Sequence, residues 1–503
     1  MKTSNSSPWA SGLAATLCCA ALVGCGGSSD DDGTPSAATV SVGTITGFGS
    51  VIVNGTRFDD RNATVTVNER TATSAQLRVG MVVAVDGRVN DCPNADVALC
   101  EGVASRIRFR NNLEGPVTAV NRLTNTLQVM GRDIEVDDAT VFDGTAAAEL
   151  GGIAVGDTVA VSGLTERERI RARLLQRTGP FVNGTTPIML HGRVANANAV
   201  QGTCTVDGVP VRFQGVPAAE LPAGGIADGQ VVEVQARTFG SGLMTADRIQ
   251  LRDRIGYPDA SRVELEGLVS GFVSAAQFVV DGQFVDASAA VFRNGSATGL
   301  GDGVAVEVEG RMAGAVLVAS KLIFRQQPGA QIVAPIQLKD AASASLVVLG
   351  QGVATTPLTQ FVDHTLAGAG RSGPLRTIGY ADLAPNDRVD VRAFKDGAGK
   401  LVATRIERTE PDPLLIARGP VDAKIPVTQL TLLGIGVDTG AATRYRDALG
   451  NLVGDAAFYE LVQVPPALPT VVRAQGVASP ASGSVIDATR TASTRGEVEI
   501  AQH

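Results

Sequence analysis

Two short motifs recur six times along the sequence, and their regular spacing constrains the fold more than any other feature. The first motif is a turn residue followed by Val-x-Val and, in most copies, by glycine. Its copies lie 73 to 83 residues apart and begin at Gly80, Gly156, Gly229, Gly303, Asn386 and Pro469. The second motif follows the first and carries an alanine, found at Ala104, Ala172, Ala246, Ala319, Ala403 and Ala488. Two motifs that share one period predict a structural unit repeated about six times.

Within each copy the residue pattern is typical of β-structure. Apolar and polar residues alternate with a period of two over 263–273, 278–287 and 304–310, and valine dominates these stretches. Asp281-Gly282 is an example of the pairs that mark tight turns, and a short helical turn is expected only around 146–152. Each copy has room for about five short strands, and closing them into a small barrel removes exposed sheet edges. The predicted fold class is therefore all-β.

The connections between copies favour separate barrels over one closed six-bladed propeller. Copies 1 and 2 are joined almost directly through 108–115, whereas the connections at 176–187 and 409–415 are longer and contain proline. A transmembrane barrel fits less well, since aromatic residues make up only 4% of the chain and such barrels need two aromatic girdles. We expect independent barrels connected like beads on a string.

The first 24 residues are typical of a secretory leader. Lys2 supplies a positive start, and the apolar stretch 13–23 is too short to span a bilayer as a helix. The sequence Leu-Val-Gly-Cys at 22–25 resembles the lipobox of bacterial lipoproteins; the alternative is an ordinary signal peptide with a chance cysteine. The resemblance implies cleavage before Cys25 and attachment of acyl chains such as palmitate to it, which anchor a protein stably in a membrane. Gly26 favours the outer membrane, on either its periplasmic or its cell-surface side.

Charge and cysteine content limit which partners, disulfides and metal sites the chain can have. The formal net charge is −8 at pH 7 and becomes −9 without Lys2, so we expect no nucleic-acid partner, because phosphate contacts need clustered cations. In an oxidising envelope we expect a disulfide between Cys92 and Cys100. Two thiolates without a nearby histidine make a poor zinc site, and a buried thiol is the expectation for Cys204.

Few residues are suited to catalysis. The three histidines are His191, His364 and His503, which lie in different copies or at the terminus and leave little room for a triad or a histidine metal site. His364 is expected at the surface. Glu264 and Glu266 share a strand face, so a cryptic hydrolase is conceivable, but ordinary solvation of an exposed face is the favoured interpretation. We predict no enzyme, no cofactor and no metal.

The most repeated polar feature is a base two positions after the repeated alanine. These bases are Arg106, Arg248, Lys321, Arg405 and Arg490. A period of two places alanine and base on one strand face. The bases are either a row of cations that binds an anionic envelope polysaccharide or, as we favour, cross-strand partners of acids on the preceding strand. The acids in question are Asp86, Glu233, Glu307 and Asp390.

The composition does not favour recognition of sugars by stacking on aromatic rings. Without the leader the chain has no tryptophan, and its only tyrosines are Tyr257, Tyr380, Tyr445 and Tyr459. A dedicated carbohydrate-binding module is therefore possible on composition but not favoured.

The repeats resemble a family of small β-barrel domains of unknown function, which occur singly or in tandem on predicted bacterial lipoproteins. The similarity is best at 43–58 and 265–285 and fades in the last two copies. The resemblance implies OB-like barrels in the cell envelope, and the family has no catalytic residues that could be assigned to positions of this chain. We thus predict a lipid-anchored, elongated, non-catalytic scaffold or binding protein, with the membrane, envelope proteins or envelope polysaccharide as partners.

The predicted organisation is a tandem array of about six OB-like five-stranded barrels behind a lipoprotein signal peptide. The signal peptide is 1–24, and the acylated cysteine with a flexible polar tether is 25–38. The barrels occupy 39–110, 111–179, 188–254, 261–326, 330–410 and 414–500.

Overall fold

The computed structural model describes most of the chain beyond residue 37. The described residues are 38–90, 99–122, 124–145, 150–166, 169–252, 257–258, 261–326, 328–365, 376–479, 482–489 and 496–501. Within these ranges the regular structure is almost entirely β, and the one α-helix is α1 (Asp455–Leu461). No helix in these ranges is long and apolar enough to cross a membrane. The predicted all-β class is confirmed.

The first repeat shows how one barrel closes. Its five main strands are β1 (Ala38–Gly47), β2 (Val51–Val53), β3 (Thr56–Asp59), β6 (Val82–Val89) and β7 (Cys100–Phe109). The ladder runs β1–β2–β3–β7–β6 and returns to β1, and every pair is antiparallel except β3–β7. A hairpin of β4 (Thr64–Val67) and β5 (Arg70–Ala72) adds to β7. Apolar side chains such as Val53, Phe58 and Ile107 fill the barrel.

The second, third and fourth repeats follow the same strand order. The second contains β8 (Leu113–Asn121), β9 (Thr126–Val129), β10 (Arg132–Glu135), β11 (Val141–Asp143), β12 (Asp157–Glu166) and β13 (Arg169–Pro180). The third contains β14 (Ile188–Asn198), β15 (Thr203–Val206), β16 (Val209–Arg212), β17 (Val231–Gly240) and β18 (Leu243–Leu251). The fourth contains β19 (Arg262–Ser274), β20 (Gln277–Val280), β21 (Gln283–Asp286), β22 (Val291–Arg293), β23 (Ala305–Ala313) and β24 (Val316–Phe324).

The last two repeats keep this order with additions. The fifth contains β25 (Ala330–Asp340), β26 (Ser345–Val348), β27 (Gln351–Ala354), β28 (Gln360–Asp363), β29 (Arg376–Thr377), β30 (Arg388–Lys395) and β31 (Leu401–Thr409). The sixth contains β32 (Leu415–Ile425), β33 (Gln429–Leu432), β34 (Ile435–Asp438), β35 (Arg444–Arg446), β36 (Leu452–Val453), β37 (Val471–Ser479), β38 (Ser482–Asp487) and β39 (Glu497–Ile500). A single 3-10 turn precedes the fourth main strand in each of the first five repeats: Ser74–Gln76, Leu150–Gly152, Ala218–Glu220, Ala297–Gly299 and Tyr380–Asp382. In the sixth repeat α1 takes that place.

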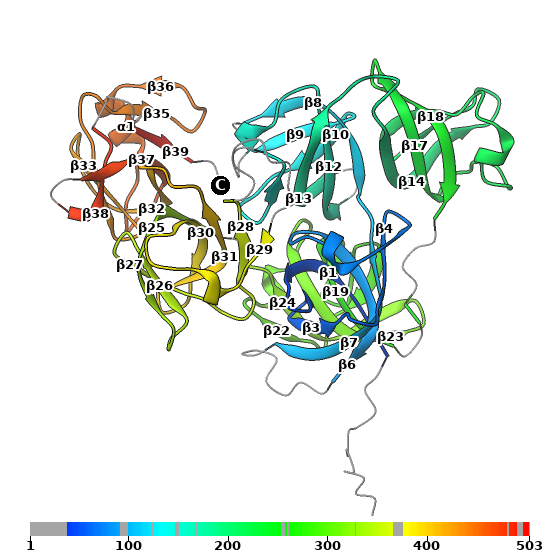
Figure 1. Ribbon diagram of the computed structural model, residues 1–503, viewed down its shortest axis with the longest axis horizontal. Helices are drawn as coiled ribbons and strands as arrows, with labels where there is room; N and C mark the ends of the chain where they lie inside the picture. The colour runs from blue at the N-terminus through cyan, green and yellow to red at the C-terminus, as the bar shows by residue number, and fades with distance from the viewer. Residues whose placement is uncertain are drawn as a thin grey trace, which may run out of the picture. The chain divides into compact units, whose positions relative to one another are not determined.

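The barrels are not independent beads, because they join in pairs through their first strands. We number the five main strands of each barrel 1 to 5 in chain order, so that in the first repeat they are β1, β2, β3, β6 and β7. The second half of strand 1 pairs with strand 2 and closes the barrel, which leaves one edge of its first half available to another barrel. β1 pairs in parallel with β19, while β8 pairs antiparallel with β14 and β25 with β32. Three continuous sheets result, containing repeats 1 and 4, 2 and 3, and 5 and 6. Figure 1 shows β1 in blue beside β19 in green. The expectation of separate barrels on a string is therefore wrong.

A tight turn braces each first strand. The turn between strands 2 and 3 places one non-glycine residue at positive φ, followed by a glycine that also has positive φ, as hairpins of this type require. The non-glycine residues are Asn54, Met130, Asp207, Asp281, Leu349 and Leu433. In the first repeat the Asn54 side chain lies across Gly43, where an added Cβ would come 2.2 Å from the amide oxygen. Asn54 Nδ2 then donates to Ser41 Oγ at 3.1 Å and to the Val42 carbonyl at 2.9 Å.

A bulge explains the repeated alanine and corrects its predicted orientation. In each of the first five repeats, strands 4 and 5 lose register next to the alanine, which faces a glycine or another alanine across the ladder. In the first repeat Gly87 pairs with Ala104, Asp86 pairs with Arg106, and Ser105 is the extra residue. The inserted residue breaks the period of two. Ala104 is consequently buried while the Arg106 side chain is 57% exposed, so alanine and base do not share a face.

The seam between β1 and β19 buries the two carboxylates that we expected on a solvated face. Ser41 is opposite Glu264 in the register, and the Thr44 amide donates to Glu266 Oε2 at 2.7 Å. Glu264 and Glu266 are 1% and 5% exposed. The prediction of an exposed face is wrong because residues of repeats 1 and 2, among them Thr44 and Arg173, cover this face of β19, which the alternation along one strand does not reveal.

The environments of these two carboxylates differ. Burial raises the pKa of Glu264 to about 7, and the Arg262 guanidinium at 3.1 Å opposes it only in part. For Glu266, burial also favours the neutral acid, but Arg325 and Arg173 outweigh it and lower the pKa. Near pH 7 the Glu264 carboxyl is therefore partly protonated, whereas the neighbouring Glu266 carboxyl is ionised.

We predict that Gly43→Ala lowers the free energy of unfolding by about 1–3 kcal/mol, because the new methyl displaces a buried, hydrogen-bonded amide. The cost should shrink in an Asn54→Gly background, since the displaced side chain is gone. Denaturant titration of the four variants measures this coupling. Gly352→Ala is the matched control, because an added Cβ meets nothing within 4 Å there. Equal costs in the two backgrounds would contradict the proposed brace.

We predict that Glu264→Gln stabilises the protein at pH 8 by about 2–3 kcal/mol and by much less at pH 5. The folded-state pKa lies above the ordinary value of 4.5, so the native carboxyl loses stability as the pH rises from there through 7, and glutamine cannot ionise. Thermal melting across this pH range tests the effect. Glu410→Gln, at an exposed position, is the control and should show no such pH dependence.

Candidate ligand-binding site

The five predicted bases do not form one site. Each belongs to a different barrel, and Arg490 lies outside the described residues. Arg106 contacts Asp86 at 3.6 Å, Arg248 contacts Glu220 at 3.0 Å and Lys321 contacts Glu309 at 2.5 Å. The favoured interpretation, an acid opposite the base on the preceding strand, is correct for Arg106 and also for Lys321, whose partner is Glu309 rather than Glu307. Arg248 and Arg405 contact acids that do not lie opposite them. The acids expected for Arg248, Lys321 and Arg405 contact other guanidiniums instead: Glu233 contacts Arg252, Glu307 contacts Arg325 and Asp390 contacts Arg392.

Arg405 and His364 belong to a buried charge cluster in the fifth repeat. Arg405 is 3% exposed and contacts Glu407 at 2.6 Å, while His364 Nε2 lies 3.1 Å from the same carboxylate. Burial alone would lower the pKa of His364, but Glu407 outweighs burial and raises it. His364 was expected at the surface, and its side chain is 13% exposed. That expectation is wrong because the imidazole turns inward to the buried carboxylate of Glu407 on β31.

The cysteines are described only in part. Cys100 is disulfide-bonded, and Cys92, its predicted partner, lies outside the described residues together with Cys25. Cys204 is a free, buried thiol, and burial raises its pKa to about 11, so it packs as a small apolar side chain. No group of three or more histidine, cysteine, aspartate or glutamate side chains suited to a metal was found within the described ranges.

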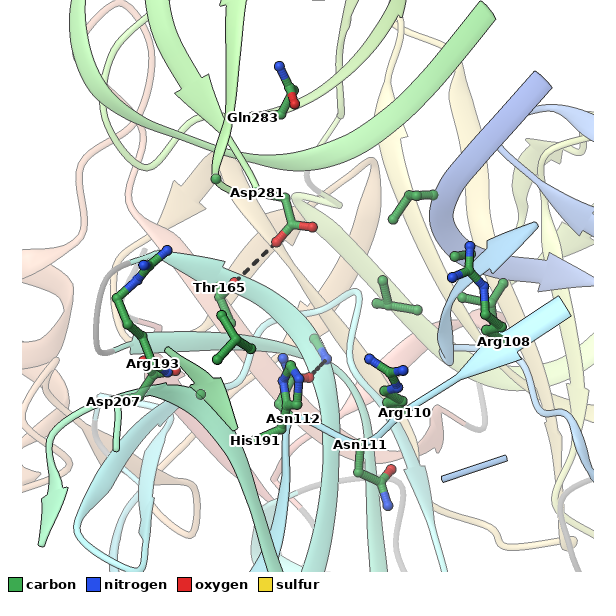
Figure 2. A pocket seen from close by; sticks show the side chains of 18 of the residues that line it. Arg108, Arg110, Asn111, Asn112, Thr165, His191, Arg193, Asp207, Asp281 and Gln283 are labelled. Carbon is green, nitrogen blue, oxygen red and sulfur yellow. Dashed lines mark hydrogen bonds between the residues drawn. The ribbon is translucent and has the colours of Figure 1, made fainter. Parts of the chain in front are cut away.

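A pocket of about 450 Å³ brings together residues of repeats 1 to 4, and we call it the junction pocket. Its volume is within the range of small-molecule sites, roughly 300–1,000 Å³. Polar side chains from five parts of the chain line it: Arg108, Arg110, Asn111, Asn112, Thr165, His191, Arg193, Asp207, Asp281 and Gln283. Figure 2 shows Arg193 and Asp207 on one side and Arg108 and Arg110 on the other.

The direct link between repeats 1 and 2 forms the floor of the junction pocket. Asn112 Oδ1 accepts the Gly163 amide at 2.8 Å, and the Asn112 carbonyl accepts the His191 amide at 3.0 Å. The Asn111 amide donates to Asn68 Oδ1 at 2.9 Å. These bonds fix the short linker against three repeats, and they explain why the chain passes from β7 to β8 almost without a loop.

Two of the Asp-Gly hairpin turns deliver carboxylates to the junction pocket. Asp207 lies across Gly192 and accepts the Arg193 amide at 2.8 Å and Arg132 Nη1 at 3.0 Å. Asp281 accepts the Thr165 hydroxyl at 3.4 Å, a contact drawn in Figure 2. The turn motif was recognised in the sequence as a structural element. The sequence pattern did not predict that these turns also supply carboxylates to a cavity, because only the pairing of barrels places two such turns beside one cavity.

The histidine of the junction pocket has an unused ring nitrogen. His191 Nε2 is buried and has no hydrogen-bond partner. Burial and then the charge of Arg110 lower the pKa of His191, so the imidazole is neutral at pH 7. A buried polar atom without a partner is uncommon in folded proteins. The pocket therefore offers guanidiniums, amides, carboxylates and one neutral imidazole, a set that suits a ligand with both donors and acceptors.

We predict that Arg405→Ala costs about 3–5 kcal/mol of unfolding free energy, because it leaves the buried Glu407 carboxylate without its main cation. Arg106→Ala should cost less than about 1 kcal/mol, as exposed ion pairs usually do. Guanidinium chloride titrations of the two variants compare them directly. Similar small costs for both would contradict the burial of the Arg405–Glu407 pair.

Five segments of the chain match the family model described as a domain of unknown function, DUF5666: residues 41–92, 114–174, 191–250, 266–322 and 336–407. Each segment lies within one of the first five barrels. The sixth barrel repeats their strand order outside the matched segments. No curated protein matches the chain. The five matches cover more than half of the sequence, and the chain therefore belongs to the DUF5666 family.

Proposed function

We propose that the protein is a lipid-anchored, non-catalytic binding scaffold of the bacterial cell envelope. The lipobox-like sequence at 22–25 and the polar segment that follows support anchoring through acyl chains on Cys25, with the outer membrane as the favoured location. The junction pocket carries the binding part of this proposal, because four repeats supply convergent polar groups to one cavity of ligand size.

The barrel topology supports the same role. We propose that each barrel is OB-like, since five strands close on themselves with one parallel pair between strands 3 and 5. OB-folds bind oligonucleotides or oligosaccharides on the face of strands 2 and 3 and on nearby loops. The negative net charge disfavours a nucleic acid, which leaves oligosaccharides and envelope proteins as the favoured partners.

A polysaccharide bound along the repeated bases is the second candidate. Arg106 and Arg248 support it, because their side chains are 57% and 44% exposed. Arg405 does not, since it is buried against Glu407. A hydrolase built on Glu264 and Glu266 is less favoured: their pKa values diverge as in an acid–base pair, but the seam between β1 and β19 covers both carboxyls.

Replacing Cys25 tests the anchor. In cells fed radiolabelled palmitate we expect the wild-type protein to carry label and to partition into the detergent phase, and Cys25→Ala to lose both properties. Cys19→Ala, which changes a cysteine before the predicted cleavage site, is the matched control and should retain them. Label retained by Cys25→Ala, or missing from the wild type, would exclude the proposed anchoring.

A further inference from the structure

We propose that the junction pocket binds an acidic sugar residue, a ring with several hydroxyl groups and one carboxylate. The inference rests on the proposed binding function and names its ligand class and its site. It differs from the row of bases considered above, because it uses one cavity shared by four repeats.

The carboxylate of the ligand is assigned to Arg193. Arg108 contacts Asp86 at 3.1 Å and Arg110 contacts Glu69, so carboxylates of the protein already neutralise both guanidiniums. Arg193 is exposed at the pocket and uses Nη1 on the Gly229 carbonyl at 2.9 Å. Among the described residues it makes no salt bridge. A guanidinium whose other N–H groups have no protein partner can donate two parallel hydrogen bonds to a carboxylate.

We assign the hydroxyl groups of the ligand to the hydrogen-bonding side chains that line the pocket together with Arg193. Asp281 and Gln283 lie on the fourth repeat and His191 on the third, and all three line the pocket. Figure 2 shows Asp281 above His191, with Thr165 between the two levels. A sugar hydroxyl both donates and accepts, so it can bond a carboxylate and also fill the vacant position at His191 Nε2.

The pocket also disfavours anions of higher charge. A phosphate dianion at Arg193 would bring a second negative charge into a cavity that Asp281 also lines, and like charges repel. A singly charged sugar acid has the smaller charge and can use its hydroxyls as donors to Asp281. The pocket wall contributes Tyr257, Val231 and Val279, which offer an apolar surface to the C–H face of a sugar ring.

The test measures binding of the full-length mature protein, in detergent micelles, to an array of oligosaccharides. The array carries uronic-acid and sialic-acid oligomers, their methyl esters and neutral oligomers of equal length. We expect the free acids to bind at least about tenfold more tightly than the esters, and Arg193→Gln to remove this preference, as expected for loss of a charge-assisted pair. Arg237→Gln is the control, because Arg237 is an exposed arginine of the same repeat that pairs with Asp247.

Thermal melting of each variant verifies that it is folded. No binding to any acidic member, or acid-selective binding that Arg193→Gln leaves unchanged, would overturn the inference. Selective binding to neutral oligomers would overturn it too, yet would support a binding scaffold. Failure of the binding scaffold would appear as no binding to any member of the array, acidic or neutral, and failure of the anchor is detected separately by the palmitate labelling of Cys25, so these outcomes are distinguishable.

Discussion

The free edge of each first strand is the constraint on which the rest of the structure depends. A five-stranded barrel of this order uses the second half of strand 1 to close against strand 2, and so exposes the backbone groups along one edge of the first half. Unpaired edges of this kind invite association, and buried backbone groups require partners. The chain satisfies them internally by joining β1 to β19, β8 to β14 and β25 to β32. Pairing of barrels is thus a consequence of how each barrel closes.

Small side chains make this pairing possible. The hairpin residue Asn54 can lie across β1 only because Gly43 has no side chain, and its amide then bonds Ser41 and Val42 at the seam. The bulge pair Gly87 and Ala104 brings strands 4 and 5 close together by the same means. The two sequence motifs therefore meet at one place, the bulge where the backbones of strands 4 and 5 approach closely, and the close approach at Gly43 lies outside both motifs.

Pairing also creates the polar interior of the molecule. Because repeats 1 and 2 pack against β19, Glu264 and Glu266 are removed from water and acquire opposite pKa shifts. The same arrangement of repeats 1 to 4 turns the Asp207 and Asp281 hairpins towards one cavity. Polar groups that would be ordinary surface residues in an isolated barrel become a buried seam and a candidate binding site.

The sequence alone determined the β class, the number of repeats and the tight turn at Asp281-Gly282, because alternation of apolar residues and turn chemistry act over a few neighbours. It also placed Asp86 opposite Arg106 correctly. It misplaced His364, Glu264 and Glu266, since burial on both faces of a strand depends on elements distant along the chain. Only the tertiary structure decided which barrels pair and that Arg193, His191 and Asp281 share a cavity. Such contacts join residues separated by tens to hundreds of positions, and no local pattern encodes their proximity.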